Sequence, residues 1–326
     1  MKTFALAAIC GLSTALMSSD DYAFMNYIAK HGKVYETVEE YGFRMNEWRK
    51  ADRYIQLHNN EMNATWTLSH NHLSDWTHAE RKSLNGLKPE LRTREYAPVL
   101  LEPSNSDGVN WVEKGAVTDV KNQGSCGSCW SFSTTGSLEG AHFIATGSLE
   151  SFSEEQFVQC DYGVTKNLGC NGGLMDKAFA YAESNAIQTE DNYPYTSGSG
   201  RRGSCDSSKL EGASLKVTTY TDVTVNSPEQ LKAALDKQPV SVAIEADKMA
   251  FQMYHSGVLT GDKCGTNLDH GVLAVGYGTE NGVEYYLVKN SWGATWGDAG
   301  YVKIGVEDGA GVCGIQSGPP SYPETN

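Results

Sequence analysis

The segment Gln123-Gly124-Ser125-Cys126-Gly127-Ser128-Cys129-Trp130 decides how the rest of the chain is interpreted. It places two cysteines three positions apart in a Gly/Ser-rich loop, and a segment of helical character follows from Trp130 to Thr146. The first turn of a helix has unpaired backbone N–H groups and roughly half a positive charge. A thiol held there loses its proton more easily, so Cys129 is predicted to be a thiolate nucleophile. The side-chain amide of Gln123 is placed to donate to an oxyanion.

The number of cysteines supports an unpaired thiol independently. The chain has eight cysteines, at positions 10, 126, 129, 160, 170, 205, 264 and 313. Cys10 lies in a predicted signal peptide, which leaves seven. Because cysteines in an oxidising compartment tend to pair, at least one of the seven stays free. Parity alone does not say which one; the loop motif selects Cys129.

The first residues have the pattern of a secretory signal. Lys2 supplies a positive charge, and Phe4 to Leu16 is an apolar run. That run is too short to cross a bilayer, which needs about 20 apolar residues. Residues 1–17 are therefore predicted to be a signal peptide, with a buried N-terminal helix as the alternative. No later run is long and apolar enough to predict a membrane span.

Charge divides the remaining chain into two parts. Residues 20–104 contain 13 acidic and 11 basic residues, whereas residues 105–326 contain 27 acidic and 14 basic residues. The acidity of the second part argues against nucleic acid or an anionic membrane as a partner. Its length is sufficient for two modest domains.

The first part is predicted to be helical and then to break. Tyr35 to Met62 contains no proline, and Phe43, Trp48, Ile55 and Met62 recur near a helical repeat. Gly86 to Ser104 contains three prolines and few periodic apolar residues, which predicts an exposed linker that proteases can cut.

Several motifs resemble those of one family. Cys126 to Trp130 matches the papain and cathepsin nucleophile signature at every place. Gly169 to Gly173 resembles the family's second glycine motif, Asn290 to Gly293 its asparagine motif, and Trp111 to Thr118 its mature N-terminal segment, which would begin near Asn105.

The propeptide motifs of the family are matched in part. The spacing of the cathepsin L-type Glu-Arg-Phe-Asn-Ile-Asn signature is followed by Glu40, Arg44, Trp48, Ala51, Ile55 and Asn59. Two of these depart from the signature in residue type: Trp48 stands in place of Phe, and Ala51 in place of the first Asn. Asn71 and Asp75 fit the Gly-x-Asn-x-Phe-x-Asp motif, from which Ser69 and Leu73 depart. The whole chain therefore resembles the precursor of a papain-family cysteine protease of the cathepsin L type.

This resemblance implies an α+β fold in two domains with the active site in a cleft between them. Residues 18–104 would form an inhibitory propeptide, residues 105–215 a helical domain and residues 216–326 a β-rich, antiparallel, barrel-like domain. The sequence itself predicts helices at 130–146, 153–159, 175–184 and 227–236, and strands at 240–245, 271–277, 284–289 and 300–304. Ser153-Glu154-Glu155-Gln156 has the pattern of a capping box.

A thiolate nucleophile needs a base that later protonates the leaving amine. The second part contains only three histidines. His142 lies about 20 Å along the helix from Cys129, and His255 occurs in a turn-like context, whereas His270 opens an apolar strand at the spacing from Cys129 that such proteases use. Asn290 would, by the resemblance, orient the imidazole of His270.

The resemblance also implies the remaining site residues. The disulfides would be Cys126–Cys170, Cys160–Cys205 and Cys264–Cys313, although sequence alone allows 15 pairings. Gly172 and Gly173 would pair with substrate main chain. The second specificity pocket would have Gly318 at its floor and would be lined by Leu174, Met175, Ala243, Leu268 and Gly271. The substrate site would also include Gly127, Asp269 and Trp292. Trp296 would lie beside the asparagine. Because this lining is apolar or small, the pocket should accept bulky hydrophobic side chains.

The sequence thus predicts a cysteine endopeptidase made as a secreted zymogen, without metal or cofactor. Its expected partners are polypeptide substrates and its own propeptide; cystatin-like inhibitors are also allowed, and a monomer is expected. Its destination would be a lysosome-like acidic compartment or the extracellular space. The competing hypotheses are a catalytically inactive papain-like binding protein and a thiol–disulfide oxidoreductase that uses Cys126 and Cys129. Exopeptidase variants carry an extra occluding loop or mini-chain, and neither is recognisable here.

Overall fold

The structure is a computed structural model that describes residues 18–62, 64–213 and 215–325. The predicted signal peptide, residues 1–17, lies outside the described residues. The helices are α1 Ser19–His31, α2 Val38–Asn59, α3 His78–Lys82, α4 Cys129–Thr146, α5 Glu154–Cys160, α6 Met175–Ser184, α7 Pro228–Leu235 and α8 Met249–Gln252. The strands are β1 Trp66–Leu68, β2 Val109–Asn110, β3 Val217–Asp222, β4 Val240–Ile244, β5 Tyr254–Leu259, β6 His270–Glu280, β7 Val283–Lys289, β8 Tyr301–Gly305 and β9 Ser321–Thr325. None of the helices in the described part of the chain is long and apolar enough to cross a membrane.

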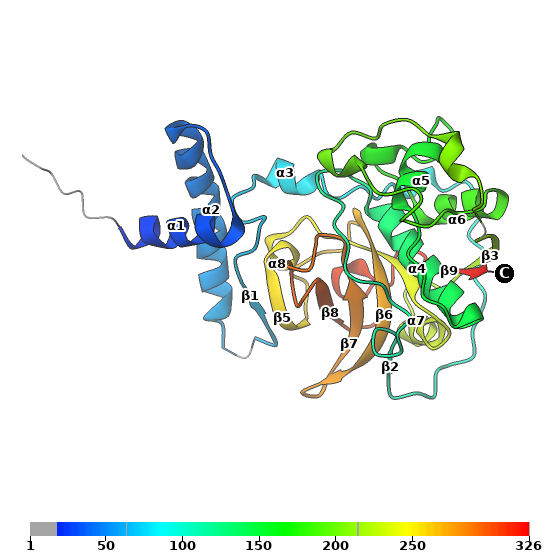
Figure 1. Ribbon diagram of the computed structural model, residues 1–326. Coiled ribbons are helices and arrows are strands. Elements are labelled where there is room, and N and C mark those ends of the chain that lie inside the picture. The colour runs from blue at the N-terminus through cyan, green and yellow to red at the C-terminus, as the bar shows by residue number, and fades with distance from the viewer. Residues whose placement is uncertain (1–17, 63, 214, 326) are drawn as a thin grey trace, which may run out of the picture.

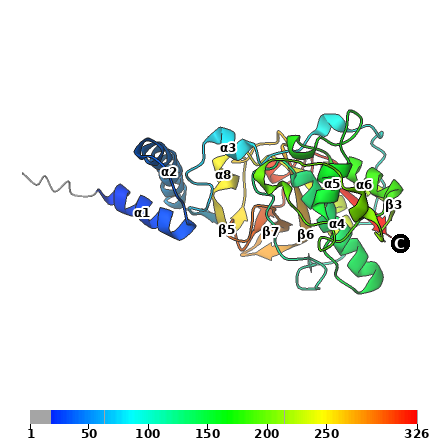
Figure 2. The same cartoon turned by 45° about the horizontal axis from the view of Figure 1, so that its top comes forward.

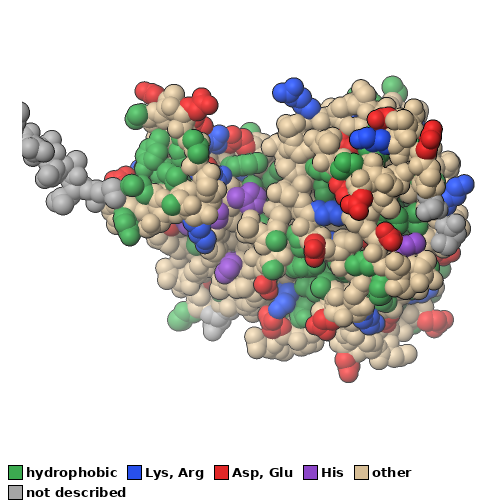
Figure 3. All heavy atoms as spheres, viewed as in Figure 1, with side chains coloured by type: hydrophobic (Ala, Val, Ile, Leu, Met, Phe, Trp, Pro, Cys, Tyr) green, Lys and Arg blue, Asp and Glu red, His purple; other side chains and the backbone are tan. Residues whose placement is uncertain are grey.

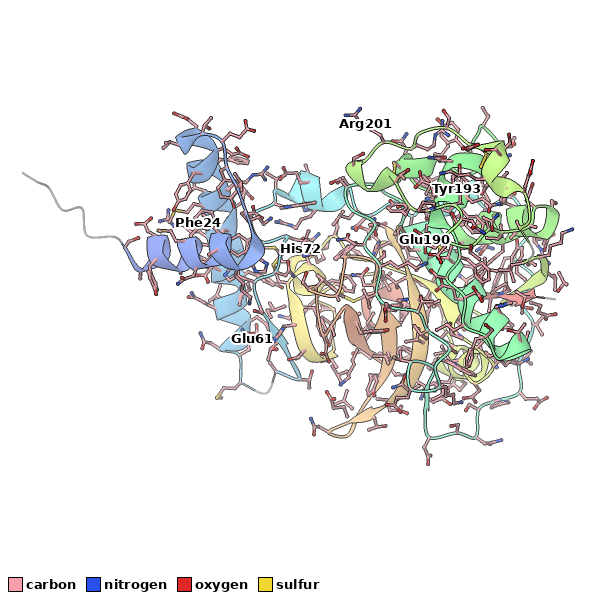
Figure 4. The ribbon with its side chains drawn as sticks, viewed as in Figure 1. Phe24, Glu61, His72, Glu190, Tyr193 and Arg201 are labelled. Carbon is pink, nitrogen blue, oxygen red and sulfur yellow. A yellow bond between two sulfur atoms is a disulfide. The ribbon has the colours of Figure 1, made fainter. Side chains whose placement is uncertain are left out.

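Helices α1 and α2 cross each other and project from the rest of the molecule as a separate lobe (Figures 1 and 2). Phe24 is fully buried at the crossing, where its ring lies 5.6 Å from that of Trp48 (Figure 4). Two residues expected on the buried face of α2 are instead in solvent, because Phe43 is 47% and Met62 is 91% exposed. Met62 lies beyond Asn59, where α2 ends, so the helical repeat does not apply to it.

The lobe is tied to the following segment by charge and hydrogen bonds. Asp75 accepts hydrogen bonds from Tyr27 Oη (2.7 Å) and Tyr35 Oη (2.9 Å), and its Oδ1 lies 2.7 Å from Lys33 Nζ. Asp75 lies three residues after His72, in the segment that leads from the lobe to the main body (Figure 4). The partly matched second propeptide motif therefore serves as the anchor of α1.

Helix α4 is the central element of the first domain, and residues 129–141 of it are all buried. Small residues allow this close packing: a Cβ at Gly136 would lie 2.6 Å from Leu273 of β6. Helix α5 begins at the predicted cap, where Ser153 Oγ accepts from the backbone N–H of Gln156. The predicted helical domain is thus formed, with α5 and α6 packed against α4.

The second domain is built on a sheet with the strand order β1-β5-β8-β7-β6-β4-β9-β3, and β2 pairs with β6. The expected two-domain α+β architecture is confirmed, but the sheet stays open instead of closing into a barrel, and its β5–β8 pair is parallel. His255 lies within β5 and not in a turn, because β5 pairs with β1 on one side and with β8 on the other.

Strand β1 belongs to the propeptide and covers the edge of β5. Trp66 pairs with Gly257, and a Cβ at Gly257 would lie only 2.4 Å from the carbonyl oxygen of Thr65. Gly257 also has a φ of +86°, which favours glycine. An otherwise unpaired strand edge is therefore closed by the propeptide.

The segment from Gly86 to Ser104 is not the freely exposed linker that its prolines suggest. Leu87 and Leu101 are only 5% and 7% exposed, although Leu100 between them is 81% exposed. Gln230 of α7 exchanges two hydrogen bonds of 2.8 Å with the backbone of Leu101. The prolines prevent regular structure, but pairing with distant residues holds the segment on the protease body.

Candidate active site

Cys129 is the first residue of α4 and the one free cysteine among the described residues. Its side chain is completely buried, and its sulfur accepts hydrogen bonds from the backbone N–H groups of Gly86 (3.3 Å) and Gly271 (3.4 Å). Burial raises the pKa of the Cys129 thiol to about 11, against the opposing effect of these donors. The thiol is therefore protonated while the propeptide covers it.

His270 opens β6 and lies against Asn290. Its Nε2 donates to Asn290 Oδ1 at 2.8 Å, and the ring of Trp292 lies 4.8 Å from the imidazole. Burial lowers the pKa of His270 to about 4, although the bond to Asn290 raises it. Nδ1 of His270 has no hydrogen-bond partner within the described part of the chain. The imidazole is therefore neutral, with one ring nitrogen oriented by Asn290 and the other available.

Gln123 is linked to this pair through Ser291. Ser291 Oγ donates to Gln123 Oε1 at 2.7 Å, and the backbone N–H of Ser291 donates to Asn290 Oδ1 at 2.8 Å. Gln123 Nε2 in turn donates to the carbonyl oxygens of Leu84 and Cys126, both at 2.8 Å. An amide donor beside the thiol thus already holds a peptide carbonyl, that of Leu84 in the propeptide.

The propeptide crosses the site in an extended form. Gly86 O accepts from Gly173 N, and Lys88 N donates to Gly173 O, both at 2.8 Å, so Leu87 and Gly173 form a parallel bridge. Leu87 N also donates to the carbonyl of Asp269 at 2.9 Å. This arrangement presents an N–H group of Gly86 to the sulfur, and not a carbonyl carbon that the sulfur could attack.

Bare backbone is required on both sides of this crossing. A Cβ at Gly86 would lie 1.9 Å from Gly127 O, and a Cβ at Gly172 would lie 2.5 Å from Gly86 O. A Cβ at Gly173 would lie 2.5 Å from the ring of Trp130. Gly127 and Gly172, both predicted at the substrate site, therefore allow the propeptide backbone at Gly86 to approach closely, whereas the bare backbone of Gly173 leaves room for the ring of Trp130.

Leu87 is buried in an apolar cluster beside the site. The residues predicted to line the second pocket share its hydrophobic cluster or pack against it: Leu174, Met175, Ala243 and Leu268. A Cβ at Gly318 would lie 2.7 Å from Leu268 Cδ1 and 3.1 Å from Ala243 Cβ, and one at Gly271 would lie 2.9 Å from Met175 Sδ. The structure thus places these residues in or against the same apolar cluster as Leu87.

Asp269 and the tryptophans complete the surroundings. Asp269 Oδ1 accepts from Ala246 N at 2.8 Å and its Oδ2 from Asn85 Nδ2 at 2.9 Å, so it faces the propeptide. Burial raises the pKa of Asp269 to about 6. Trp292 packs at 5.3 Å against Trp296, whose indole N–H donates to Gln252 O. The aromatic rings exclude water from the bond between His270 and Asn290.

Three disulfides brace the two domains. Cys126–Cys170 and Cys160–Cys205 lie in the helical domain, and Cys264–Cys313 lies in the β-rich domain. Because Cys126 is bonded to Cys170, the two cysteines of the Cys-x-x-Cys segment are not joined to each other. This pairing does not fit a dithiol redox centre.

Comparisons with known proteins agree with this geometry. The papain family cysteine protease model matches residues 105–323, and the cathepsin propeptide inhibitor domain model matches residues 24–80. The chain belongs to the papain family of cysteine proteases. In this family member, an inhibitor domain precedes the protease domain.

Similar proteins include curated plant proteases. The cysteine protease XCP2 of Arabidopsis thaliana is 40% identical over 341 residues, which cover 96% of this chain and 94% of that protein. The probable cysteine protease RD21B of Arabidopsis thaliana is 47% identical over 278 residues, which cover 83% of this chain. The match spans only 58% of the length of RD21B.

Solved structures resemble this papain-family chain over most of its length. The Amb a 11 cysteine protease, a major ragweed pollen allergen, has been solved in its proform; it is 35% identical with a TM-score of 0.83, and the match covers 95% of each chain. Digestive procathepsin L 3 of Tenebrio molitor is 33% identical with a TM-score of 0.81, covering 94% of this chain and 99% of that one.

Some residues at the site of this papain-family protease were not predicted. The propeptide stretch from Leu84 to Lys88 had no assigned contact, and Ser291 had no assigned role within its motif. Tyr195 was also missed, although its hydroxyl bonds both Ser128 Oγ and Gln123 O at 2.8 Å. In the sequence, only Gly86, which has no side chain and comes shortly before Pro89, indicates that the stretch from Leu84 to Lys88 could cross the site. A lone tyrosine such as Tyr195 gives no sequence indication of its role.

Proposed function

We propose that the chain is the zymogen of a cysteine endopeptidase in which Cys129 attacks the substrate carbonyl. The observation that carries this proposal is a free cysteine at a helix start, with a propeptide N–H held against its sulfur. The same sulfur accepts from the N–H of Gly271, the residue after His270, whose imidazole is oriented by Asn290. Once the propeptide leaves, the site is hydrated and the thiol transfers its proton to His270 Nδ1. The resulting thiolate and imidazolium form the reactive pair.

The proposed reaction has two halves. The thiolate adds to the substrate carbonyl carbon, and Gln123 Nε2 donates to the resulting oxyanion. In the zymogen, the same Nε2 donates to the carbonyl oxygen of Leu84. His270 then gives its proton to the leaving amine as the C–N bond breaks, which leaves a thioester on Cys129. Water, deprotonated by His270, hydrolyses the thioester and frees the acid.

Replacement of the nucleophile tests the proposal. Cys129→Ser should abolish peptide hydrolysis and labelling by a thiol-directed epoxide after acid maturation by added wild-type enzyme, because a serine hydroxyl is not ionised by the imidazole. Circular dichroism and thermal melting should show an intact fold. Labelling at Cys126 in the wild-type enzyme, or residual hydrolysis by the variant, would refute the assignment.

The second pocket is proposed to prefer bulky hydrophobic side chains, because Leu87 occupies an uncharged lining. Peptides with Leu or Phe as the second residue before the scissile bond should be cut at least about 100-fold faster than those with Arg, since a buried unpaired guanidinium is costly. Fluorogenic peptides that differ only at that residue measure kcat/KM for each.

Gly318 supplies a matched pair of variants for this preference. Gly318→Glu and Gly318→Gln both require Leu268 to move, because a Cβ there lies 2.7 Å from Leu268 Cδ1. Only the glutamate adds a charge, so the difference between the two variants isolates it. If Gly318→Glu gains no Arg cleavage relative to Gly318→Gln, the position of the pocket floor is wrong.

The remaining proposals concern partners and compartment. The propeptide is proposed to act as the enzyme's own inhibitor in the intact zymogen, supported by its crossing of the site and by the inhibitor-domain match. Polypeptides are the proposed substrates, cystatin-like proteins are proposed as additional inhibitors, and the mature enzyme as a monomer. The three disulfides support the secretory pathway, ending in a lysosome-like compartment or outside the cell.

A further inference from the structure

A second contact between propeptide and protease lies beyond the second pocket. After the 3-10 turn Pro89–Leu91, Arg92 directs its guanidinium between two carboxylates. Its Nη2 forms an ion pair with Asp176 Oδ2, and its Nη1 lies 3.5 Å from Asp222 Oδ2. The two aspartate side chains are 5% and 3% exposed. A single arginine thus lies between two buried acids.

The surroundings of this acid pair suit a guanidinium. Arg94 lies over the ring of Tyr220 with its Cζ 4.5 Å from the ring centroid, an arrangement that favours arginine. A surface hollow of about 410 Å³ adjoins Asp176 and Tyr220. Its rim carries Glu183 and Lys177, but the Lys177 ammonium donates to Thr165 O at 2.6 Å and does not reach the acid pair.

The acids and the cations belong to different parts of the precursor. Asp176 lies in α6 and Asp222 and Tyr220 in β3, two elements of the protease body that lie side by side (Figure 1), whereas both arginines belong to the propeptide. Removal of the propeptide takes both arginines away from two close carboxylates. Such a pair gains free energy by taking up a proton or another cation. Even with Arg92 in place, burial raises the pKa of Asp176 to about 6.

The location relates the pair to substrate binding. Gly86 donates to the Cys129 sulfur, Leu87 belongs to the apolar cluster that contains the predicted second-pocket residues, and Arg92 follows Leu87 after the turn Pro89–Leu91. Asp176 directly follows Met175, a residue of that pocket. The acid pair therefore lies on the side where substrate residues precede the one in the second pocket.

We propose that Asp176, Asp222 and Tyr220 of the mature enzyme form a binding site for an arginine of the substrate, N-terminal to the residue in the second pocket, and that Arg92 occupies this site in the zymogen. This inference rests on the proposed endopeptidase function. With this site, the enzyme should prefer substrates that combine a hydrophobic residue near the scissile bond with an arginine further upstream. The uncharged second pocket alone cannot supply the preference for arginine.

The test uses enzyme matured from the full chain at acid pH. Fluorogenic peptides carry Leu as the second residue before the scissile bond and one arginine placed in turn at the third to seventh residue before it. Matched peptides carry citrulline, a neutral isostere, at the same place. At one position, arginine should lower KM at low salt by about fivefold to tenfold relative to citrulline, with kcat nearly unchanged, as a partly exposed ion pair allows. High salt should reduce the difference.

Variants assign the effect to residues. Asp222→Asn and Asp176→Asn should each remove most of the preference for arginine over citrulline, whereas Glu150→Gln, at an exposed remote site, should keep it. Equal KM values for the two peptide series at every position in the wild-type enzyme would overturn the inference. A preference for arginine over citrulline that survives when Asp176→Asn and Asp222→Asn are combined would also overturn it. If a variant fails to fold, the wild-type comparison and its salt dependence still decide.

Two further arms separate alternative outcomes. A short Leu peptide without arginine reports hydrolysis by Cys129 alone, so loss of this activity contradicts the proposed function, whereas normal activity without an arginine effect contradicts only this inference. A synthetic peptide of residues 84–96 tests the released propeptide as the source of the arginine. If it inhibits equally with Arg92 or citrulline at that position, the acid pair does not recognise arginine, and the inference fails.

Discussion

At the scale of single residues, one side-chain bond determines which proton His270 can move. Asn290 Oδ1 accepts the proton on Nε2, so the basic nitrogen is Nδ1, which has no partner within the described residues. The same oxygen accepts from Ser291 N, which holds the amide in one orientation. In the proposed mechanism, the unbonded Nδ1 is the nitrogen that exchanges a proton with the thiol and the leaving amine.

Asn290→Ala should therefore lower kcat by about 5-fold to 150-fold, because a buried hydrogen bond of about 1–3 kcal/mol is lost. Since the bond raises the pKa of His270, its loss should also move the alkaline limb of the kcat/KM profile to lower pH, where the imidazolium is lost earlier. The measurement is kcat/KM between pH 4 and pH 9. Ser291→Ala, which leaves the His270 bond in place, is the control; a wild-type profile for Asn290→Ala would contradict the role.

At the scale of elements, an acid-resistant ion pair joins two helices of the propeptide. Arg44 of α2 makes two hydrogen bonds of 2.7 and 2.8 Å to Glu80 of α3, and these lower the pKa of Glu80 to about 2. A lowered carboxyl pKa contributes stability above its unfolded value, about 4.5, and loses it as the pH falls toward 2. This link between α2 and α3 therefore survives at pH 4.5 and above.

The stretch at Gly86 is the element whose fit should control latency. In Gly86→Ala the new methyl group would lie 1.9 Å from Gly127 O, so backbone must shift and the bonds to Cys129 Sγ and Gly173 weaken. The intact zymogen should then hydrolyse a short Leu peptide at neutral pH about 5-fold to 150-fold faster, for an overlap of about 1–3 kcal/mol.

Gly42 of α2 provides the matched control, because nothing lies within 4 Å of a Cβ built there. Gly42→Ala should remain as latent as the wild-type zymogen. If Gly86→Ala is equally latent while its propeptide is intact on a gel, the close approach at Gly86 does not maintain inhibition.

Sequence predicted those elements whose partners are encoded locally. The helix after Cys129, the cap at Ser153 and the strand after His270 each follow from periodicity or spacing. Strand β1 was not predicted, because it has three residues and exists through its pairing with β5, nearly 200 positions later. The active-site candidates could be named because the chemistry requires particular residue types, whereas the stretch at Gly86 acts through its backbone and leaves little trace in sequence.

At the scale of the whole molecule, latency combines a covered site with a suppressed ionisation. The propeptide lobe stands apart and exposes apolar side chains of its own, such as Tyr22 and Met25, which are 62% and 49% exposed (Figure 3). Cys129 and His270 are both completely buried, and the stretch that continues from the lobe covers the Cys129 sulfur with the N–H of Gly86. Burial disfavours the charged form of each group, so the pKa values of about 11 and about 4 describe a neutral pair.

This separation predicts how the thiol titrates before and after maturation. Because a buried thiol with a raised pKa gains its charge only near pH 11, the zymogen should show no Cys129 thiolate between pH 6 and pH 9. The mature enzyme, whose thiol and imidazole are hydrated and can stabilise each other as ions, should show thiolate throughout this range. The thiolate absorbance near 240 nm, measured as the difference between wild-type and Cys129→Ser protein in each form, reports this ionisation without requiring a reagent to reach the site. An equal thiolate signal in zymogen and mature enzyme would mean that the propeptide only blocks access; its absence from the zymogen alone would mean that the propeptide also keeps the nucleophile protonated.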